Sequence, residues 1–216
     1  MTYDAAAVSG LTVSRRSTRR WHTSAVVVVE RRISPEDLER MLDEGELDYQ
    51  YELELVDGEI IYLGLPSLYH NAVVLAILRL LFPFADTIGG RLFGEAAGFR
   101  TGPEGRNLRA PDVSLVTASR IAIVEGDGRW GLAAPDLAVE VLSPDQYVDA
   151  YARQKVPEYM AAGARVVWLV NPEARTVRAF YAARDDVEVY SGDAEITLDA
   201  LAPGFRSSIA GFFPAR

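Results

Sequence analysis

Two acidic residues and one lysine are the side chains whose types and spacing could do chemistry. Glu140 lies inside the apolar run 137–142, and Asp112 directly precedes a second apolar run, 113–116. A carboxylate within a core strand is costly unless a cation or a donor lies near it. Lys155 follows Glu140 in the next helical stretch, and it is the only lysine among the 22 Lys and Arg residues. A lysine at this one position indicates a need for a compact ammonium, although a single residue can also stand there by chance.

Two carboxylates side by side repel each other, so one holds a proton unless a cation lies between them. Mg²⁺ binds in proteins through one or two carboxylates while it keeps several waters, and it lowers the pKa of a bound water. A nearby lysine can orient that water or stabilise negative charge in the transition state. Asp112, Glu140 and Lys155 are therefore candidates for metal-dependent hydrolysis. The alternative is that they form buried ion pairs with no chemistry.

Other common chemistries lack their residues. The chain has no cysteine, which excludes thiolate nucleophiles, disulfides and zinc–thiolate sites. The two histidines, His22 and His70, do not form a zinc-binding helical pair, and no serine lies in a Gly-x-Ser-x-Gly turn. A phosphate-binding loop with its own lysine is also missing, since Lys155 is in no such setting.

The length of 216 residues predicts one domain, and the net charge of −9 is unevenly distributed. Residues 1–32 carry a balance of +4 and are expected to be a loosely ordered extension, whereas residues 33–216 carry −13. An acidic body argues against broad binding to duplex DNA but leaves room for a nucleic-acid substrate in a local cleft. No apolar run approaches a membrane span, so we expect a cytoplasmic protein without membrane contact.

The elements that must position these residues follow from periodicity and turn signals. Residues 135–172 predict a strand, a helix and a second strand, with residues 137, 139 and 141 facing one side and Glu140 the other. Pro157 predicts a kink close to Lys155, or a helix that begins near it. Further along the chain we expect a helix over 34–44 with Ser34 as N-cap, and a hairpin over 52–63 that turns at Asp57-Gly58. A second helix over 68–82, with Ser67 as N-cap, is expected to end at Pro83, and the glycines within 86–107 indicate a tight bend. The fold class is α/β (α+β), with a mixed sheet flanked by helices.

Five stretches together resemble a known family. They are ELVDGEIIYL (54–63), PSLYHNAVVLAIL (66–78), RAPDVSLV (109–116), PDLAVEVLSP (135–144) and KVPEYMAAGARVVWLVNP (155–172). The chain resembles the PD-(D/E)xK nuclease superfamily and, within it, the Uma-two family of restriction-endonuclease-like proteins. Leu142 stands where the superfamily has its usual lysine, and Lys155 matches the helical lysine of the Uma-two proteins instead.

The resemblance implies a restriction-endonuclease-like domain over 33–216 that hydrolyses phosphodiester bonds of nucleic acid, with DNA as the expected substrate. It implies Mg²⁺ as cofactor, with Mn²⁺ as a substitute, held by Asp112, Glu140 and the Val141 carbonyl. Lys155 would activate water, and Glu54 and His70 would line the site, although Glu52 could face it in place of Glu54. A homodimer is expected by analogy with nucleases that cut duplexes. The competing interpretation is a non-catalytic nuclease-fold module for protein interaction or dimerisation.

Overall fold

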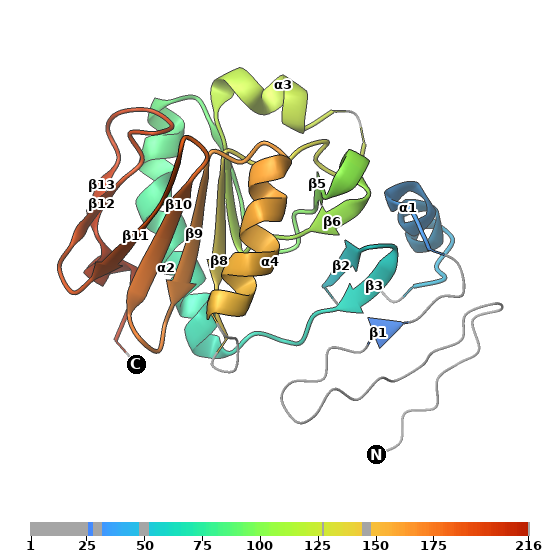
Figure 1. The fold of residues 1–216 in the computed structure, drawn as a ribbon, viewed down its shortest axis with the longest axis horizontal. Helices are drawn as coiled ribbons and strands as arrows, with labels where there is room; N and C mark the ends of the chain where they lie inside the picture. The colour runs from blue at the N-terminus through green and yellow to red at the C-terminus, as the bar shows by residue number, and fades with distance from the viewer. Residues whose placement is uncertain (1–25, 28–31, 48–51, 127, 144–147, 216) are drawn as a thin grey trace, which may run out of the picture.

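The computed structural model describes residues 26–27, 32–47, 52–126, 128–143 and 148–215 (Figure 1). Residues 1–32, for which the sequence predicts loose order, lie almost entirely outside these described ranges.

A six-stranded mixed sheet forms the centre of the domain. Its strand order is β11 (Arg184–Ser191), β10 (Thr176–Tyr181), β9 (Val166–Asn171), β8 (Leu137–Val141), β7 (Val113–Val116) and β4 (Arg91–Phe93). β8 and β9 pair in parallel through the crossover helix α4 (Val148–Ala161), and the other neighbours pair antiparallel. The mixed sheet with flanking helices is therefore confirmed, and so is the predicted strand–helix–strand unit.

A second, antiparallel sheet lies beside the first. Its order is β1 (Val26–Val27), β3 (Glu59–Tyr62), β2 (Leu53–Val56), β6 (Asn107–Arg109) and β5 (Phe99–Thr101). β2 and β3 form the predicted hairpin, in which Asp57 and Gly58 have φ angles of 51° and 79°. Positive φ at both central residues is the requirement of the tight hairpin turn that Asp-Gly favours.

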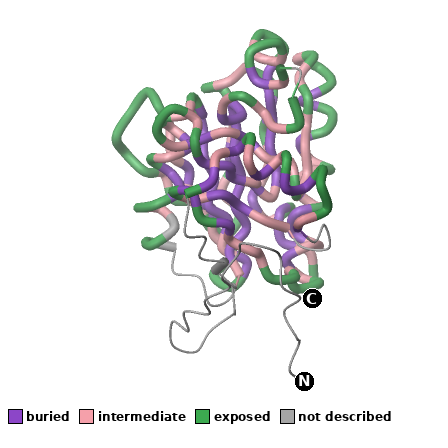
Figure 2. The backbone as a smooth tube through the Cα atoms, turned by 90° about the vertical axis from the view of Figure 1, so that its right-hand side faces the viewer, coloured by how far each residue is buried: buried purple, intermediate pink, exposed green. Residues whose placement is uncertain are grey.

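Two long helices cover opposite faces of the six-stranded sheet (Figure 1). α2 (Leu68–Thr87) packs on the face to which Leu137, Val139 and Val141 point, and α4 packs on the face of Ala138. The alternation predicted for this strand is confirmed. Buried backbone runs through the centre of the domain between these layers (Figure 2).

The remaining elements are short. They are α1 (Pro35–Asp43), α3 (Ile121–Val124), the 3₁₀ turns η1 (Pro103–Gly105), η2 (Ala118–Arg120) and η3 (Ile209–Phe212), and the strand pair β12 (Glu195–Thr197) and β13 (Arg206–Ser208). α1 begins at the predicted N-cap Ser34, whose side chain accepts from the Asp37 amide.

Pro83 and Pro157 lie inside their helices. The prediction that Pro83 ends its helix is wrong, since α2 continues to Thr87. Phe84 and Ala85 are buried in the core, and their packing favours continuation despite the lost backbone hydrogen bond. Pro157 also lies within α4, so Lys155 sits in the middle of a helix and not at its start.

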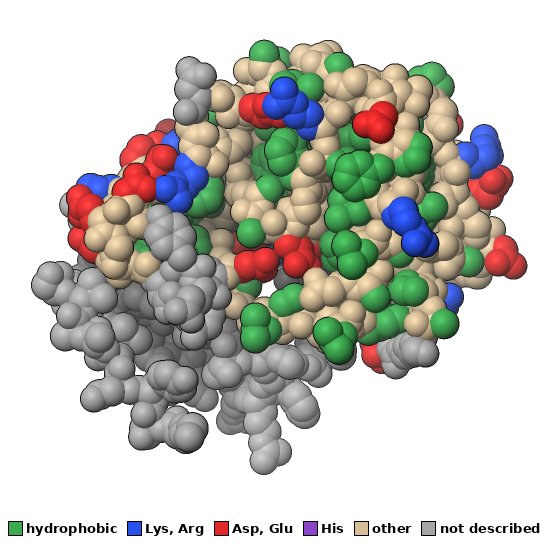
Figure 3. Space-filling model, turned by 180° about the vertical axis from the view of Figure 1, so that it is seen from behind, with side chains coloured by type: hydrophobic (Ala, Val, Ile, Leu, Met, Phe, Trp, Pro, Cys, Tyr) green, Lys and Arg blue, Asp and Glu red, His purple; other side chains and the backbone are tan. Residues whose placement is uncertain are grey.

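Because α2 passes Pro83, it is longer than the sequence indicated. With 20 residues it is long and apolar enough, by length and composition, to cross a membrane. Within the helix, 39% of an apolar 18-residue stretch is buried inside the domain. One side packs on the sheet, while Leu68, Leu75 and Phe82 are exposed on the outer side. Hydrophobic side chains are spread over that face of the molecule in Figure 3.

We predict that Pro83→Ala stabilises the domain. Pro83 is exposed, so the change removes little buried surface, and alanine restores a donor in the helix interior. The free energy of unfolding in urea should rise by about 1–3 kcal/mol. Pro203→Ala in an exposed turn is the control and should leave stability equal or slightly lower. A loss of stability in Pro83→Ala would contradict the account of α2.

Candidate active site and metal centre

Lys155 is buried between two carboxylates. Its Nζ donates to Glu54 Oε1 at 3.0 Å and to both carboxylate oxygens of Glu140 at 3.1 Å. The lysine is 6% exposed, and Glu54 and Glu140 are 2% and 4% exposed. The sequence paired a lone lysine with a core glutamate, and the structure brings them into direct contact.

Helix α4, which carries Lys155, also supplies a second hydrogen-bond donor to Glu140. The Tyr159 hydroxyl donates to Glu140 Oε1 at 2.6 Å. Burial, together with the neighbouring Asp112 and Glu54 carboxylates, raises the pKa of Glu140 to about 7 against the attraction of Lys155. Glu140 therefore changes its protonation state near neutral pH, which suits a group that exchanges protons with a reacting centre. Burial also raises the pKa of Tyr159, so its hydroxyl keeps the proton that it donates.

Glu54 joins Lys155 to a second buried cation. Arg109 Nη1 donates to Glu54 Oε2 at 2.8 Å, and its Nη2 donates to Glu158 Oε2 at 2.6 Å. Burial would raise the pKa of Glu54, but Lys155 and Arg109 outweigh this and hold it below its usual value. Thr101 and Asn107 donate to the other oxygen of Glu158. Three carboxylates thus share two cations, and we call Glu54, Arg109, Glu140, Lys155 and Glu158 the buried ion cluster.

The buried ion cluster connects the two sheets. Glu54 and Arg109 come from β2 and β6 of the antiparallel sheet, whereas Glu140 comes from β8 of the mixed sheet. α4 lies between them and supplies Lys155 and Glu158, which are three residues apart and share one helical face. The charges hold the antiparallel sheet in one position against α4.

A second group of ligand-type side chains lies at the end of β7. His70 Nε2 is 3.1 Å from Asp112 Oδ1 and 3.5 Å from Glu95 Oε1. The ligand atoms of these three residues all lie within 4.8 Å of one another. The other Asp112 oxygen accepts from the Val141 amide at 2.5 Å, which fixes the carboxylate beside the end of β8. We call His70, Glu95 and Asp112 the acid–imidazole group.

Local backbone geometry aims each member of this group. Ser67 caps α2 and accepts from the His70 amide, which holds His70 in the first helical turn. Ala96 follows Glu95 with φ of 68°, a left-handed conformation that is costly for alanine and is found at functional sites. Asp112 is one residue before β7, whose register sets Val113 opposite Val139 of β8.

The acid–imidazole group fits a divalent cation. Two carboxylates and one imidazole are a donor set for Mn²⁺, and carboxylates are the ligands of Mg²⁺. Glu95 Oε1 is buried with no hydrogen-bond partner among the described residues, as a ligand atom would be without its ion. Burial would lower the pKa of His70, but Asp112 and Glu95 raise it above its usual value. Burial and Asp112 raise the pKa of Glu95.

Comparison with known proteins assigns the family. The model of the Uma-two family, described as "Putative restriction endonuclease", matches residues 35–210. The chain belongs to the Uma-two family. A crystal structure from Anabaena variabilis, of a protein described as a "putative nuclease", superposes with a TM-score of 0.67 over 84% of this chain and 97% of that one. Its sequence is 24% identical, so it supports the fold alone. No curated protein matches the chain.

The predicted site residues of this Uma-two domain fall into two adjoining groups. Glu54, Glu140 and Lys155 lie in the buried ion cluster, and His70 and Asp112 in the acid–imidazole group. The backbone atom of Val141 that contacts Asp112 is its amide, and ligation by the carbonyl stays a prediction. Glu54, not Glu52, contacts Lys155.

Glu52 lies on the side of the acid–imidazole group. It is two residues before Glu54 and therefore on the same side of the chain. Burial raises its pKa, and the carboxylates of Glu95 and Asp112 raise it further. The sequence left open whether Glu52 or Glu54 faces the site. In the structure Glu54 lies in the buried ion cluster, and Glu52 lies near the acid–imidazole group.

Sequence reasoning missed Glu95, Arg109 and Glu158. Glu158 had a signal, since it lies three residues after Lys155 on one helical face. Arg109 stands within the RAPD segment and gave a weaker signal. Glu95 lies in a loop between β4 and β5, and only the glycines around it indicated a bend.

We predict that Lys155→Met strongly destabilises this Uma-two domain. Removing one partner of a buried ion pair leaves the other charges uncompensated, at a cost of about 3–5 kcal/mol near pH 8. The cost should be smaller at pH 5, because Glu140 can then be protonated. Urea unfolding of Lys155→Met is compared with that of Arg153→Met, an exposed cation on the same helix. Equal stabilities of the two variants would contradict burial of the lysine.

The raised pKa of Glu140 predicts how stability depends on pH. Its folded pKa of about 7 lies above its ordinary value of 4.5, so the folded state holds the proton more tightly. The stabilisation from this group is present below about pH 4.5 and is lost as pH rises through 7. Unfolding free energies measured between pH 4.5 and 8 should therefore fall more in the wild type than in Glu140→Gln. Parallel curves for the two proteins would show that Glu140 does not titrate in this range.

Proposed function

We propose that the domain is a metal-dependent nuclease that hydrolyses phosphodiester bonds of nucleic acid. The observation that supports this most is the buried ammonium of Lys155, held on Glu140 beside a group of carboxylates and an imidazole that fits a cation. A lysine and a divalent-cation site next to each other match the needs of phosphodiester hydrolysis. Membership of the Uma-two family points to the same reaction.

Asp112, Glu95 and His70 would hold the cation, and Glu140 on the central strand β8 is a further carboxylate close to Asp112. A bound divalent cation would neutralise charge on a phosphoryl oxygen and lower the pKa of a water molecule. The Val141 amide keeps one Asp112 oxygen in place and leaves the other toward His70 and Glu95. Mg²⁺ is the proposed ion, and Mn²⁺ should bind more tightly because imidazole is a better ligand for it.

Lys155 would carry positive charge at the reacting centre. Its ammonium needs no reorganisation, because Glu54 and Glu140 already fix it. Glu140, with a pKa near 7, can accept a proton from an attacking water and pass it on. Tyr159 holds Glu140 in position through its hydroxyl.

We further propose DNA as the substrate, a cytoplasmic location and a homodimer. A homodimer would bring two sites to a duplex, one for each strand. The acidic body of the chain means that binding must depend on a local site and on the cation that offsets its carboxylates.

A second candidate is a non-catalytic module in protein interaction or dimerisation. One observation favours it, namely that Lys155, Arg109 and their three carboxylates already satisfy one another as ion pairs. In that case the buried ion cluster contributes to fold specificity alone.

Metal titration tests the proposed centre. Calorimetry with Mn²⁺ and Mg²⁺ should show one site in the wild type, and Asp112→Asn and Glu95→Gln should each weaken it about tenfold or more. Affinity should rise with pH, because His70 must lose its proton to become a ligand. Asp86→Asn on the exposed part of α2 is the matched control and should bind metal as the wild type does. Metal affinity that is unchanged in both Asp112→Asn and Glu95→Gln would reject the proposed centre.

Nuclease assays on single-stranded and duplex DNA and on RNA then separate the two candidate functions. Lys155→Arg keeps a buried cation and should keep most of the stability, but a guanidinium does not reproduce the compact charge of an ammonium. We expect folded, metal-binding Lys155→Arg with strongly reduced cleavage. If the wild type binds metal and cuts none of these substrates, the non-catalytic module is the better account.

A further inference from the structure

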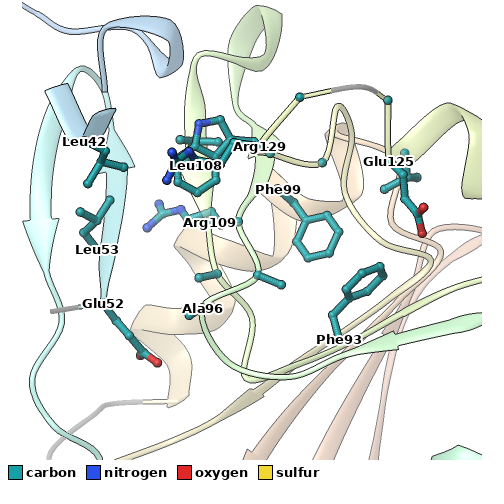
Figure 4. A pocket seen from close by; sticks show the side chains of 18 residues that line it. Leu42, Glu52, Leu53, Phe93, Ala96, Phe99, Leu108, Arg109, Glu125 and Arg129 are labelled. Carbon is teal, nitrogen blue, oxygen red and sulfur yellow. The ribbon is translucent and has the colours of Figure 1, made fainter. Parts of the chain in front are cut away.

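A large pocket opens next to the acid–imidazole group, and the mechanism above does not use it. Its volume is about 660 Å³, within the range of small-ligand sites. One side is formed by Leu53 and Glu52 at β2, and the other by Phe93 and Phe99 at β4 and β5 (Figure 4). The loop after α3 contributes Trp130.

The aromatic side of the pocket is held rigidly. The rings of Phe93 and Phe99 meet edge to face, with centroids 5.8 Å apart and planes at 80°. Two glycines allow the aromatic rings to lie directly on the backbone. A Cβ at Gly98 would approach Trp130 to 2.7 Å, and one at Gly131 would approach Phe99 to 2.5 Å. The Gly131 amide also donates to the Gly98 carbonyl, which ties the loop to β5.

Apart from Glu52 at the β2 side, the charged side chains that line the pocket are paired with opposite charges. Arg109 donates to Glu54 and Glu158, Arg129 pairs with Asp43, and Glu125 pairs with Arg91. What remains for a ligand is a mainly apolar, aromatic surface, which favours a flat uncharged group over an anion.

The pocket borders the candidate site through Glu52 and through the chain neighbours of Glu95 and Asp112. Glu52 lines the pocket, and the carboxylates of Glu95 and Asp112 help to raise its pKa. Ala96, directly after Glu95, and Ala110, two residues before Asp112, line it as well. A ligand in the pocket is therefore a neighbour of a group bound at Asp112.

We propose that this pocket receives the base of an unpaired nucleotide whose phosphate lies at the acid–imidazole group. The inference rests on the proposed function and narrows its substrate to single-stranded or locally unpaired nucleic acid. Bases inside a duplex are stacked and paired and cannot enter, whereas an unpaired base can stack on an aromatic side chain. The aromatic wall and the adjoining carboxylates match the two ends of one nucleotide.

An uncharged nucleoside tests the pocket without metal or phosphate. Adenosine titrated into ¹⁵N-labelled full-length protein should shift the Trp130 indole N–H resonance saturably, and ribose should not. Trp130→Phe assigns the resonance, and the buried Trp168 reports an intact fold. Phe93→Ala should weaken binding about tenfold, and Phe93→Leu, which keeps bulk without the ring, should also weaken it. Phe82→Ala, an exposed phenylalanine on α2, is the matched control. No saturable shift, or the same affinity in the Phe93 variants, overturns the inference.

Oligonucleotides connect the pocket to the reaction. Fluorescence anisotropy in the presence of Ca²⁺ should show that a short single strand binds more tightly than its duplex. Replacing one nucleotide of the single strand by an abasic residue should reduce this difference in affinity. Cleavage of duplex DNA at equal rates by wild type and Phe93→Ala would refute the pocket and leave the nuclease proposal intact. Adenosine binding with no cleavage of any substrate would refute the nuclease proposal and leave the base pocket standing.

Discussion

The structure depends on the burial of one ammonium between two carboxylates from different sheets. Lys155 contacts Glu54 of the antiparallel sheet and Glu140 of the mixed sheet, each almost fully buried. Removing these charges from water is costly, and only close mutual contacts offset the cost. Arg109 and Glu158 extend the contacts, so the antiparallel sheet, α4 and the mixed sheet must meet in one arrangement. Breaking one of these pairs would leave an uncompensated buried charge, so the buried ion cluster constrains how the two sheets and α4 meet.

That arrangement sets the surroundings of Asp112. The ladder between β7 and β8 brings Asp112 to the Val141 amide, next to Glu140, and the first turn of α2 adds His70. Excess negative charge results, since Glu52, Glu95, Asp112 and Glu140 lie near one another. The pKa values of Glu52, Glu95 and Glu140 are raised accordingly. A divalent cation would relieve this repulsion, which is the physical link between the fold and the proposed reaction.

The sequence was sufficient for features that depend on local rules. The alternation around Glu140, the Asp57-Gly58 turn and the Ser34 and Ser67 caps each follow from period or backbone preference, and the structure confirms them. Pro83 was misjudged because burial of Phe84 and Ala85 outweighs the missing backbone hydrogen bond. Glu95 could not be found, since its position depends on a left-handed turn at Ala96 and on contacts across the fold.

The most direct test of the account is a crystal of the wild-type protein soaked in Mn²⁺ and measured for anomalous scattering. The account predicts a peak within coordination distance of Asp112 and Glu95, with Lys155 still bonded to Glu140. A Mn²⁺-saturated crystal without a peak at this position, or one in which Lys155 points to solvent, would contradict it.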